Sequence, residues 1–344
     1  MENNLVEFGI GCSDTFSVEK ATRLVRTWED AGAANIAMTD NKLARDPYCV
    51  VALCGTQTRR TKLGVIAADP YTRHPALTAS SIATVDEATN GRAFLWVSAG
   101  LGGHRELGVK RERPTLAVRE CYEIIKQLLT GKELDYHGKI LSFNKGRLSI
   151  PPRPNIPISI MSRSPKLLEL AGEIADGVVL GGFSSKASIE YATKSFKVGL
   201  QKSRRDLKDV DVTTWVSFTV DKDRAAARTF ILDGLTEKLW SGAKSFLYEA
   251  GIDIPEKINK LTSEFEMSRD SIDECKKLLI ENPEFTEELI EHFTICGDPS
   301  DCIQKFESVA ELGINRIFIN PVAPNRDIEP IVDTFLKGIV PRIN

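Results

Sequence analysis

The fold of this chain is decided by one stretch, Lys62-Leu-Gly-Val-Ile-Ala-Ala-Asp-Pro-Tyr-Thr-Arg-His-Pro75, which continues as Ala76-Leu-Thr-Ala-Ser-Ser-Ile-Ala-Thr-Val-Asp-Glu-Ala88. It predicts a short apolar strand over 62–66, an Asp-Pro turn, a basic and aromatic loop, and a helix of small residues. In a parallel α/β protein, ligands bind to the loops that follow the carboxyl ends of the strands. The small residues Ala67 and Ala68 indicate that something flat and bulky approaches the backbone there.

The same order of strand and helix recurs on both sides of this stretch. Strands are predicted over 6–10, 35–39, 62–66, 92–98, 157–161, 177–180, 212–220 and 316–319. Helices are predicted over 18–31, 47–58, 75–88, 113–129, 165–175, 186–203, 299–312 and from 328 to 335. Eight βα units in one chain of this size predict a (β/α)8 TIM barrel. An open doubly wound sheet is the alternative, but no strand is followed by the GxGxxG turn that would favour it.

Two segments interrupt the alternation of strands and helices, and both are predicted to be insertions. Residues 130–154, before the fifth strand, are polar and rich in Gly and Pro, and Tyr136-His-Gly-Lys139 is expected to form the tip of a hairpin. Residues 222–293, before the eighth strand, have helical patterns with charged faces and are too long for a simple connection. We therefore expect a single barrel domain over residues 1–344 with insertions at about 130–154 and 222–293.

Composition limits the classes of partner. The formal net charge of the 344 residues is -3, which gives no reason to expect nucleic acid or an anionic membrane. No apolar run approaches the roughly 20 residues of a membrane span, and Met1-Glu-Asn-Asn-Leu5 has no export signal. The seven cysteines and four histidines are scattered without CxxC or HExxH spacing, so we expect free thiols, no metal and a cytoplasmic protein.

One group of residues at the ends of strands has the chemistry of an anion site. Ser162, Arg163 and Ser164 stand before Pro165, and proline at the first helical position defines the amino end of a helix. Free amides, hydroxyls and a guanidinium at one point suit a phosphate, and Gly181-Gly182 after the next strand would allow a second close approach. The alternative is a helix cap beside a surface arginine.

Other strand ends carry groups that can bind or move a proton. The loop over 98–108 ends in His104, Arg105 and Glu106, and His104 or Glu106 could shuttle a proton. The alternative is that they are solvated residues on a lid. Asp40, directly after the second strand, could hydrogen-bond the polar edge of a ring or could cap a turn. His137 and His292 are expected to have structural roles.

These pieces together resemble the bacterial luciferase-like superfamily of TIM-barrel flavin and deazaflavin enzymes, and within it the coenzyme F420-dependent methylenetetrahydromethanopterin reductases. The resemblance covers strands one to seven and the Gly297-Asp-Pro and Gly313-Ile-Asn-Arg segments. Its most specific parts are Asp69-Pro-Tyr-Thr-Arg-His-Pro75, Thr78-Ala-Ser-Ser-Ile-Ala-Thr84, Asn90-Gly-Arg-Ala93 and Lys166-Leu-Leu-Glu-Leu-Ala-Gly-Glu-Ile-Ala-Asp-Gly-Val178.

The resemblance implies where a cofactor would lie. It implies a bulge after the third strand with a non-prolyl cis peptide at Ile66–Ala67, which supports the ring from behind, and a phosphate at the anion site. The residues expected at the cofactor are Thr39, Asp40, Asn41, Ile66, Ala67, Ala68, Ser98, Gly100, Met161, Ser162, Arg163, Ser164, Gly181 and Gly182. The expected catalytic residues are Asp40, His104 and Glu106.

The chain also departs from the reductases. Asn41 stands where relatives often carry histidine, Gly11 stands where the reductases have glutamate, and Leu101 or Gly102 falls where they have an acid. These departures predict an organic substrate other than methylenetetrahydromethanopterin, with the cofactor class retained.

The resemblance implies an F420-dependent oxidoreductase that exchanges hydride with a small organic molecule. A reduced-FMN-dependent monooxygenase and a non-catalytic cofactor-binding barrel are the alternatives. It also implies a homodimer formed through the early helices.

Overall fold

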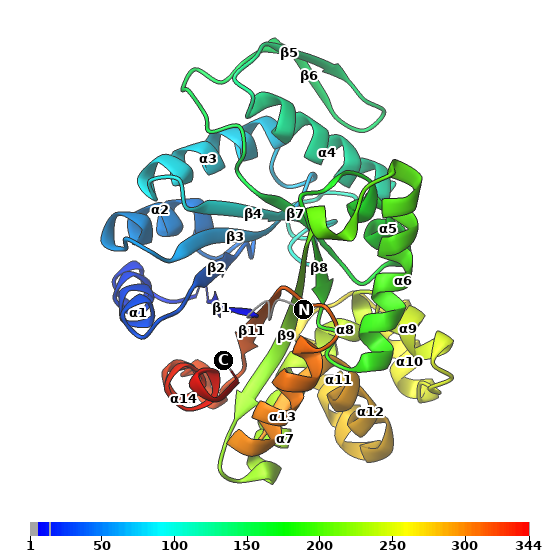
Figure 1. The fold of residues 1–344 in the computed structure, drawn as a ribbon. Helices are drawn as coiled ribbons and strands as arrows, with labels where there is room; N and C mark the ends of the chain where they lie inside the picture. Colours follow the sequence, from blue (N-terminus) through cyan, green and yellow to red (C-terminus); the bar gives the residue numbers. More distant parts are fainter. Residues whose placement is uncertain (1–5, 14, 344) are drawn as a thin grey trace.

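The computed structural model describes residues 6–13 and 15–343, and its strands close into a barrel (Figure 1). The barrel consists of eight parallel strands in this described part: β1 (Glu7–Cys12), β2 (Asn35–Thr39), β3 (Lys62–Ala68), β4 (Ala93–Val97), β7 (Ile158–Ser162), β8 (Gly177–Gly181), β9 (Asp211–Val220) and β11 (Arg316–Pro321). Pairing of β9 with both β8 and β11, and of β11 with β1, completes the ring. The predicted TIM barrel is confirmed, and the open doubly wound sheet is wrong.

Helices cover the outside of this ring (Figure 1). They are α1 (Val18–Asp30), α2 (Pro47–Gln57), α3 (Pro75–Ala88), α4 (Pro114–Leu128), α5 (Pro165–Ile174), α6 (Lys186–Ser203), α13 (Pro299–Ala310) and α14 (Glu329–Thr334). The chain ends in a π-helix (Phe335–Ile339) and α15 (Val340–Ile343), and two short helical turns cover Leu207–Asp209 and Pro324–Arg326. Five of these helices begin at a proline, whose fixed φ and missing N–H suit the first turn.

The first insertion is a hairpin, β5 (Leu134–His137) and β6 (Ser142–Gly146), which stands over α4. Its turn lies at residues 138–141, two residues later than the predicted tip. The carboxylate of Glu120 on α4 sets this position, because it accepts hydrogen bonds from the backbone N–H groups of Lys139, Ile140 and Leu141 at 2.7–2.9 Å. The hairpin is therefore fixed by a buried acid on the helix beneath it.

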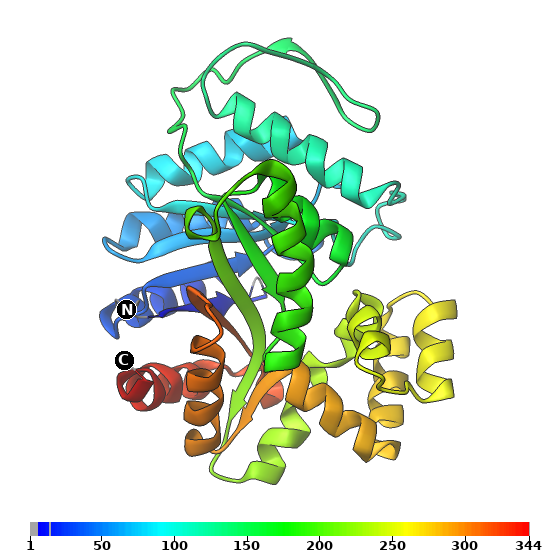
Figure 2. The ribbon, with the colours of Figure 1, turned by 45° about the vertical axis from the view of Figure 1, so that its right-hand side comes forward.

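The second insertion, residues 222–293, is a helical block beside the barrel (Figure 2). It contains α7 (Arg224–Ile231), a turn (Leu232–Gly234), α8 (Thr236–Trp240), α9 (Ala243–Glu249), α10 (Glu256–Glu264), α11 (Arg269–Glu281) and α12 (Pro283–Phe293). A short strand that the sequence did not predict, β10 (Thr294–Gly297), follows and pairs with the last four residues of β9. The insertion thus returns to the sheet before α13 begins.

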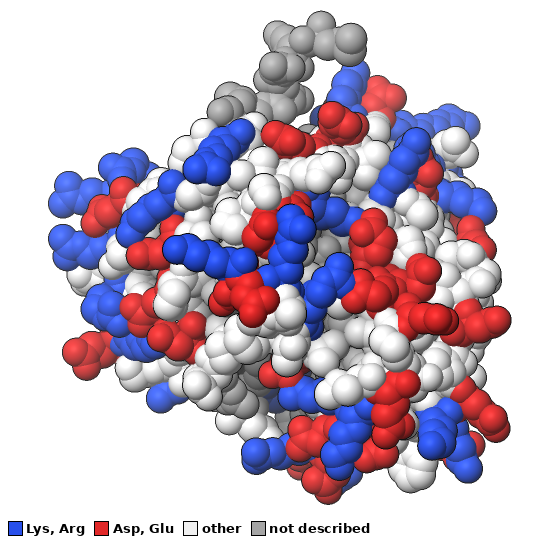
Figure 3. Space-filling model, turned by 90° about the horizontal axis from the view of Figure 1, so that it is seen from below, with Lys and Arg blue, Asp and Glu red and all other residues white. Residues whose placement is uncertain are grey.

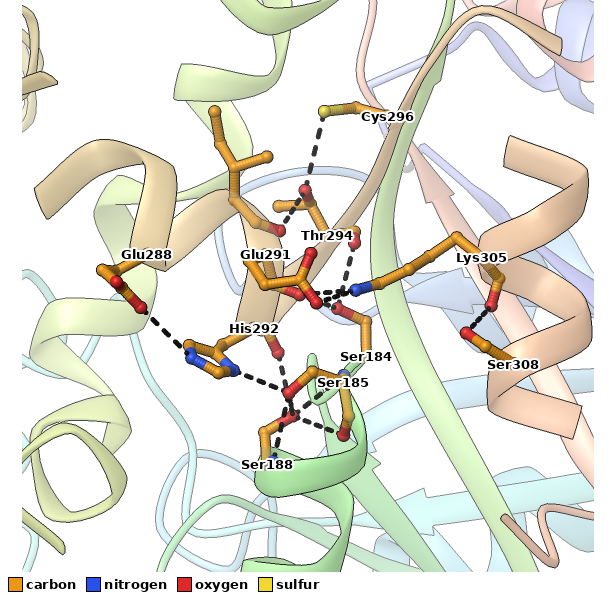
Figure 4. Close-up of polar contacts among 11 residues, drawn as sticks. Ser184, Ser185, Ser188, Glu288, Glu291, His292, Thr294, Cys296, Lys305 and Ser308 are labelled. Carbon is orange, nitrogen blue, oxygen red and sulfur yellow. Dashed lines mark hydrogen bonds and ion pairs between the residues drawn. The ribbon is translucent and has the colours of Figure 1, made fainter. Parts of the chain in front are cut away.

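A polar junction attaches α12 to the loop between β8 and α6 (Figure 4). The Ser184 N–H donates to the backbone carbonyl of His292 at 3.0 Å, and the Ser184 hydroxyl donates to the carbonyl of Thr294 at 2.9 Å. The hydroxyl of Ser185 lies 2.6 Å from His292 Nδ1, and His292 Nε2 lies 3.4 Å from Glu288. These contacts give His292 the structural role expected for it and fix one end of the helical block.

Aromatic rings fill the barrel interior. Phe318, Trp96 and Trp215 are buried there and meet edge to face or tilted, with centroids 4.8–6.3 Å apart. Two glycines of β1 make room for them: a Cβ atom at Gly9 would lie 2.5 Å from the Phe318 ring, and one at Gly11 would lie 2.3 Å from the Trp215 indole. An acid at position 11 would therefore collide with Trp215, and glycine fits there.

The described surface carries charges of both signs. On the face drawn in Figure 3, Lys and Arg side chains are interspersed with Asp and Glu. Within residues 6–13 and 15–343 no helix is long and apolar enough to cross a membrane, and no group of three or more His, Cys, Asp or Glu is placed to hold a metal ion.

Candidate functional site

The residues predicted to bind a cofactor converge at one end of the barrel. Each lies at the carboxyl end of a strand or in the loop just beyond it: β2 for 39–41, β3 for 66–68, β4 for 98–100, β7 for 161–164 and β8 for 181–182. Because parallel strands of a barrel all end on the same face, these five segments surround one mouth. This placement agrees with the expectation that ligands bind to the loops after the carboxyl ends of the strands.

The bulge after the third strand is present. The register of β3 against β4 shifts between Val65 and Ala68, and the peptide bond between Ile66 and Ala67 is cis, as the resemblance implied. The Asp40 N–H donates to the carbonyl of Ile66 at 2.6 Å, and the Ser98 N–H donates to that of Ala68 at 2.9 Å. The bulge is thus tied to the loops on both sides, and its partly exposed member is the small Ala67.

Beside the bulge, four titratable side chains form a buried polar cluster. Lys42 Nζ lies 2.8 Å from Asp69 Oδ2 and 3.7 Å from Asp40 Oδ2, and His104 Nε2 lies 3.6 Å from Asp69 Oδ2. The four side chains are at most 11% exposed. Asp69 also accepts hydrogen bonds from the N–H groups of Tyr71 and Thr72 and from the Thr72 hydroxyl.

The protein environment shifts the pKa values of these groups in different directions. Burial raises the pKa of Asp40, and the Lys42 ammonium opposes this only in part. Burial acts on Asp69 in the same direction, but Lys42 and the N–H donors outweigh it and lower the pKa of Asp69. Burial lowers the pKa of His104 in spite of the Asp69 carboxylate, so the imidazole is neutral at pH 7. Two carboxyls with opposite shifts beside a neutral histidine form a set that can hold and transfer a proton.

Loop geometry decides which residue of the 98–108 segment enters this cluster. Gly100 has a φ of +71°, and a Cβ atom on it would lie 2.6 Å from His104 Cε1 and 2.9 Å from Asp69 Oδ2. The loop therefore packs closely on the imidazole, whose buried Nε2 has no hydrogen-bond partner within the described residues. Glu106 is exposed and pairs with Arg105 at 4.0 Å, so the structure does not bring it to the cluster.

The second part of the site is cationic and lies across the mouth, after β7 and β8. Arg163 is 8% exposed, which excludes the surface arginine that was the alternative. Its guanidinium donates to the Ser241 hydroxyl and lies 3.6 Å from Glu237, but its buried Nε has no hydrogen-bond partner among the described residues. A Cβ atom on Gly181 would lie 3.1 Å from Arg163 Cγ, so the glycine lets the backbone approach the arginine. An unsatisfied buried donor beside bare backbone fits an anionic group.

Sequence reasoning missed three members of the site, Lys42, Asp69 and Lys238. Lys42 lies two residues after Asp40, and Asp69 is the acid of the Asp-Pro turn quoted at the outset. Lys238, on α8 of the helical block, is 1% exposed and donates to the Ser217 hydroxyl of β9 at 2.9 Å. A strand-end rule could have found Asp69, whereas no signal in the sequence separates Lys238 from the other lysines of the block.

Comparisons with known proteins agree with the barrel fold. A family model for luciferase-like monooxygenases matches residues 6–316. The 5,10-methylenetetrahydromethanopterin reductase of Archaeoglobus fulgidus is 29% identical over 98% of this chain and 100% of its own length. The F420-dependent glucose-6-phosphate dehydrogenase of Gordonia bronchialis is 22% identical over 96% of this chain and 95% of that protein.

The structure of the coenzyme F420-dependent tetrahydromethanopterin reductase from Methanopyrus kandleri superposes with a TM-score of 0.84 at 26% identity, over 98% of this chain and 99% of that one. Since the family model spans most of the chain and the fold agrees over nearly all of it, this chain belongs to the luciferase-like monooxygenase family.

Proposed function

We propose that this protein is an oxidoreductase that binds coenzyme F420 at the mouth of the barrel and exchanges hydride between it and an organic substrate. The observation that carries the proposal is the pairing, across one mouth, of a small-residue bulge at Ala67 with the buried cation Arg163. The first fits the face of a flat ring and the second fits an anionic tail. Relatives whose names include F420 support the choice of cofactor.

The residues present would hold such a cofactor in two places. Thr39, Asn41 and the bulge would contact the ring, and Arg163 with the Ser162 and Ser164 loop would bind the phosphate. When bound, the deazaflavin supplies the carbon that carries hydride. Asp40, whose raised pKa lets it keep a proton at higher pH than an ordinary carboxyl, and neutral His104 would hold the proton that accompanies the hydride.

Titration calorimetry of the purified protein tests the proposal, with F420 and FMN in oxidised and reduced form. We expect micromolar binding of F420, and at least about tenfold weaker binding to Arg163→Met, because a charge-assisted contact is lost. Arg147→Met, at an exposed position, is the matched control and should bind as the wild type does. Micromolar binding of FMN with none of F420 would overturn the proposal.

A reduced-FMN monooxygenase is the second candidate, favoured by the description of the family model. It shares the scaffold and differs in its demand for oxygen. Oxygen uptake with reduced FMN and a panel of sulfonates, alkanes and aldehydes would establish it. Tight cofactor binding without turnover of any acceptor would favour the third possibility, a non-catalytic barrel.

A homodimer through the outer face of α2 and α3 belongs to the same proposal. Helix α2 has no charged residue, and the only charged residues of α3 are Asp86, which is buried, and Glu87. Leu53 and Leu77 on these helices are 47% and 60% exposed. An uncharged helical face with large apolar side chains suits a second copy of itself. Light scattering at micromolar concentration should give twice the chain mass, and a monomer would contradict the dimer.

A cytoplasmic location is also proposed, from the seven cysteines. Cys49, Cys54, Cys121, Cys275, Cys296 and Cys302 form no disulfide within the described residues, and thiols outside disulfides are typical of a reducing compartment. Fractionation of the native cells should find the protein with cytoplasmic enzymes, and recovery from the medium would contradict this.

A further inference from the structure

The helical block places one buried cation, Lys238, against the barrel. Within the described residues, the ammonium of Lys238 on α8 donates to the Ser217 hydroxyl, which in turn donates to the Gly234 carbonyl at 3.1 Å. The nearby Glu237 carboxylate, at 3.8 Å, is beyond hydrogen-bonding distance. An ammonium carries three donors, so Lys238 has capacity left for another acceptor.

Lys238 and Arg163 flank the same glycine. A Cβ atom on Gly182 would lie 3.5 Å from Lys238 Nζ and 3.6 Å from Arg163 Nη2. Since both nitrogens lie within 3.6 Å of one point, they are at most about 7 Å apart. Charge-assisted N–H···O bonds are about 2.8 Å long, so two oxygens of one tetrahedral anion can reach both nitrogens. The φ of +91° at Gly182 disfavours any residue with a side chain at this point between the two cations.

The two cations come from different parts of the fold, and both parts are held in place. The loop that carries Gly182 is attached to α12 through Ser184 and Ser185 (Figure 4). On the other side, a Cβ atom on Gly242, after α8, would lie 3.3 Å from Arg163 Cβ. The helical block therefore touches the anion site directly.

We propose that Lys238 and Arg163 form a two-cation site for a phosphate-type group, completed only when the helical block is docked on the barrel. This proposal rests on the proposed function in one respect, namely that the group bound between the two cations is the phosphate of the cofactor. The helical block then supplies the second cation of the anion site, and Arg163 Nε, which has no partner in the described part of the chain, supplies a further donor.

Because Lys238 is buried, binding of an anion beside it is coupled to protonation of its amine. Burial lowers the pKa of Lys238 to about 7, Glu237 on its own helix opposes the shift, and Arg163 adds to it. At pH 8 about nine-tenths of these amines are neutral, whereas at pH 6 most are charged. An anion placed beside the amine stabilises its charged form, so binding at pH 8 takes up close to one proton and binding at pH 6 takes up few.

Sulfate is a suitable probe, because it stays a dianion throughout this range and takes up no proton itself. Calorimetry of sulfate binding to the whole protein, in buffers of different ionisation enthalpy at pH 6 and pH 8, measures the proton uptake. We expect saturable binding at both values, with nearly one proton taken up at pH 8 only. Absence of saturable binding, or binding at pH 8 without proton uptake, would overturn the proposal.

Two variants assign the proton to Lys238. Lys238→Met should lose the uptake and bind sulfate at least about tenfold more weakly, while Arg163→Met should weaken binding and keep an uptake at pH 8. Lys257→Met, at an exposed position of α10, is the matched control. If Lys238→Met does not fold, sulfate binding and proton uptake by the wild type and by Arg163→Met still test the two-cation site.

Titration with F420 keeps the two proposals apart. If F420 binds to the wild type and to Lys238→Met equally well, the two-cation site is wrong and the proposed function stands. If sulfate binds with proton uptake but F420 does not bind, the site stands and the cofactor assignment is wrong.

Discussion

Replacing Lys42 with methionine tests the buried cluster beside the bulge. The substitution leaves the Asp69 carboxylate buried without its cation, which costs about 3–5 kcal/mol in comparable sites. Asp69 keeps three hydrogen bonds, from the Tyr71 and Thr72 N–H groups and the Thr72 hydroxyl, so we expect the lower end, about 3 kcal/mol. With an unfolding entropy of about 2.1 cal/mol/K per residue, this lowers the Tm of the 344-residue chain by roughly 4 °C.

The pKa of His104 is the more telling readout. The Lys42 charge lowers this pKa and the Asp69 charge raises it. Lys42→Met should therefore raise the pKa of His104, and Asp69→Asn should lower it further. With four histidines in the chain, a pH titration of their ring protons by NMR resolves the shift.

The control is Lys337→Met, which removes an exposed ion pair with Asp333 and should cost less than about 1 kcal/mol. Lys42→Met/Asp69→Asn should recover much of the lost stability, because the unpaired charge is gone. The reasoning is refuted if Lys42→Met costs no more than the control, or if both single variants shift the pKa of His104 in the same direction.

Three further predictions concern packing and pH. Gly11→Glu should cost more than about 3 kcal/mol in urea unfolding, since its Cβ meets the Trp215 ring at 2.3 Å, and adding Trp215→Gly should restore part of the loss. Gly182→Ala should cost roughly 1–2 kcal/mol because of its positive φ and should weaken sulfate binding through contact with Lys238; an unchanged affinity would contradict the site. Burial lowers the pKa of His292, so its contribution to stability is present above about pH 6.5 and is lost as the pH falls, and His292→Ala should flatten this dependence in thermal melts.

Much of the fold follows from local patterns in the sequence. Largely apolar runs of four to nine residues followed by helices predict the eight barrel strands, and prolines such as Pro47 and Pro75 mark the starts of helices. The strand at 294–297 was missed because it follows α12 directly, with no turn residue to separate the two, and it forms by pairing with β9. The hairpin was found but its turn was misplaced, since the contact that fixes it comes from Glu120 on α4.

The candidate site was only partly predictable, for a physical reason. Residues directly after strands, such as Asp40 and Arg163, are placed by the barrel itself and could be named in advance. His104 and Glu106 are separated by one residue, and only the loop geometry around Gly100 decides that the first is buried and the second exposed. Lys238 reaches the mouth through the docking of an insertion, which is a tertiary contact that no local pattern records.

A crystal structure of the protein with F420 bound tests the central claim most directly. The account predicts the deazaflavin ring against Ala67 in the bulge and the phosphate within hydrogen-bonding distance of Arg163 and Lys238. A ring bound away from residues 66–68, or a phosphate that contacts neither cation, would contradict it.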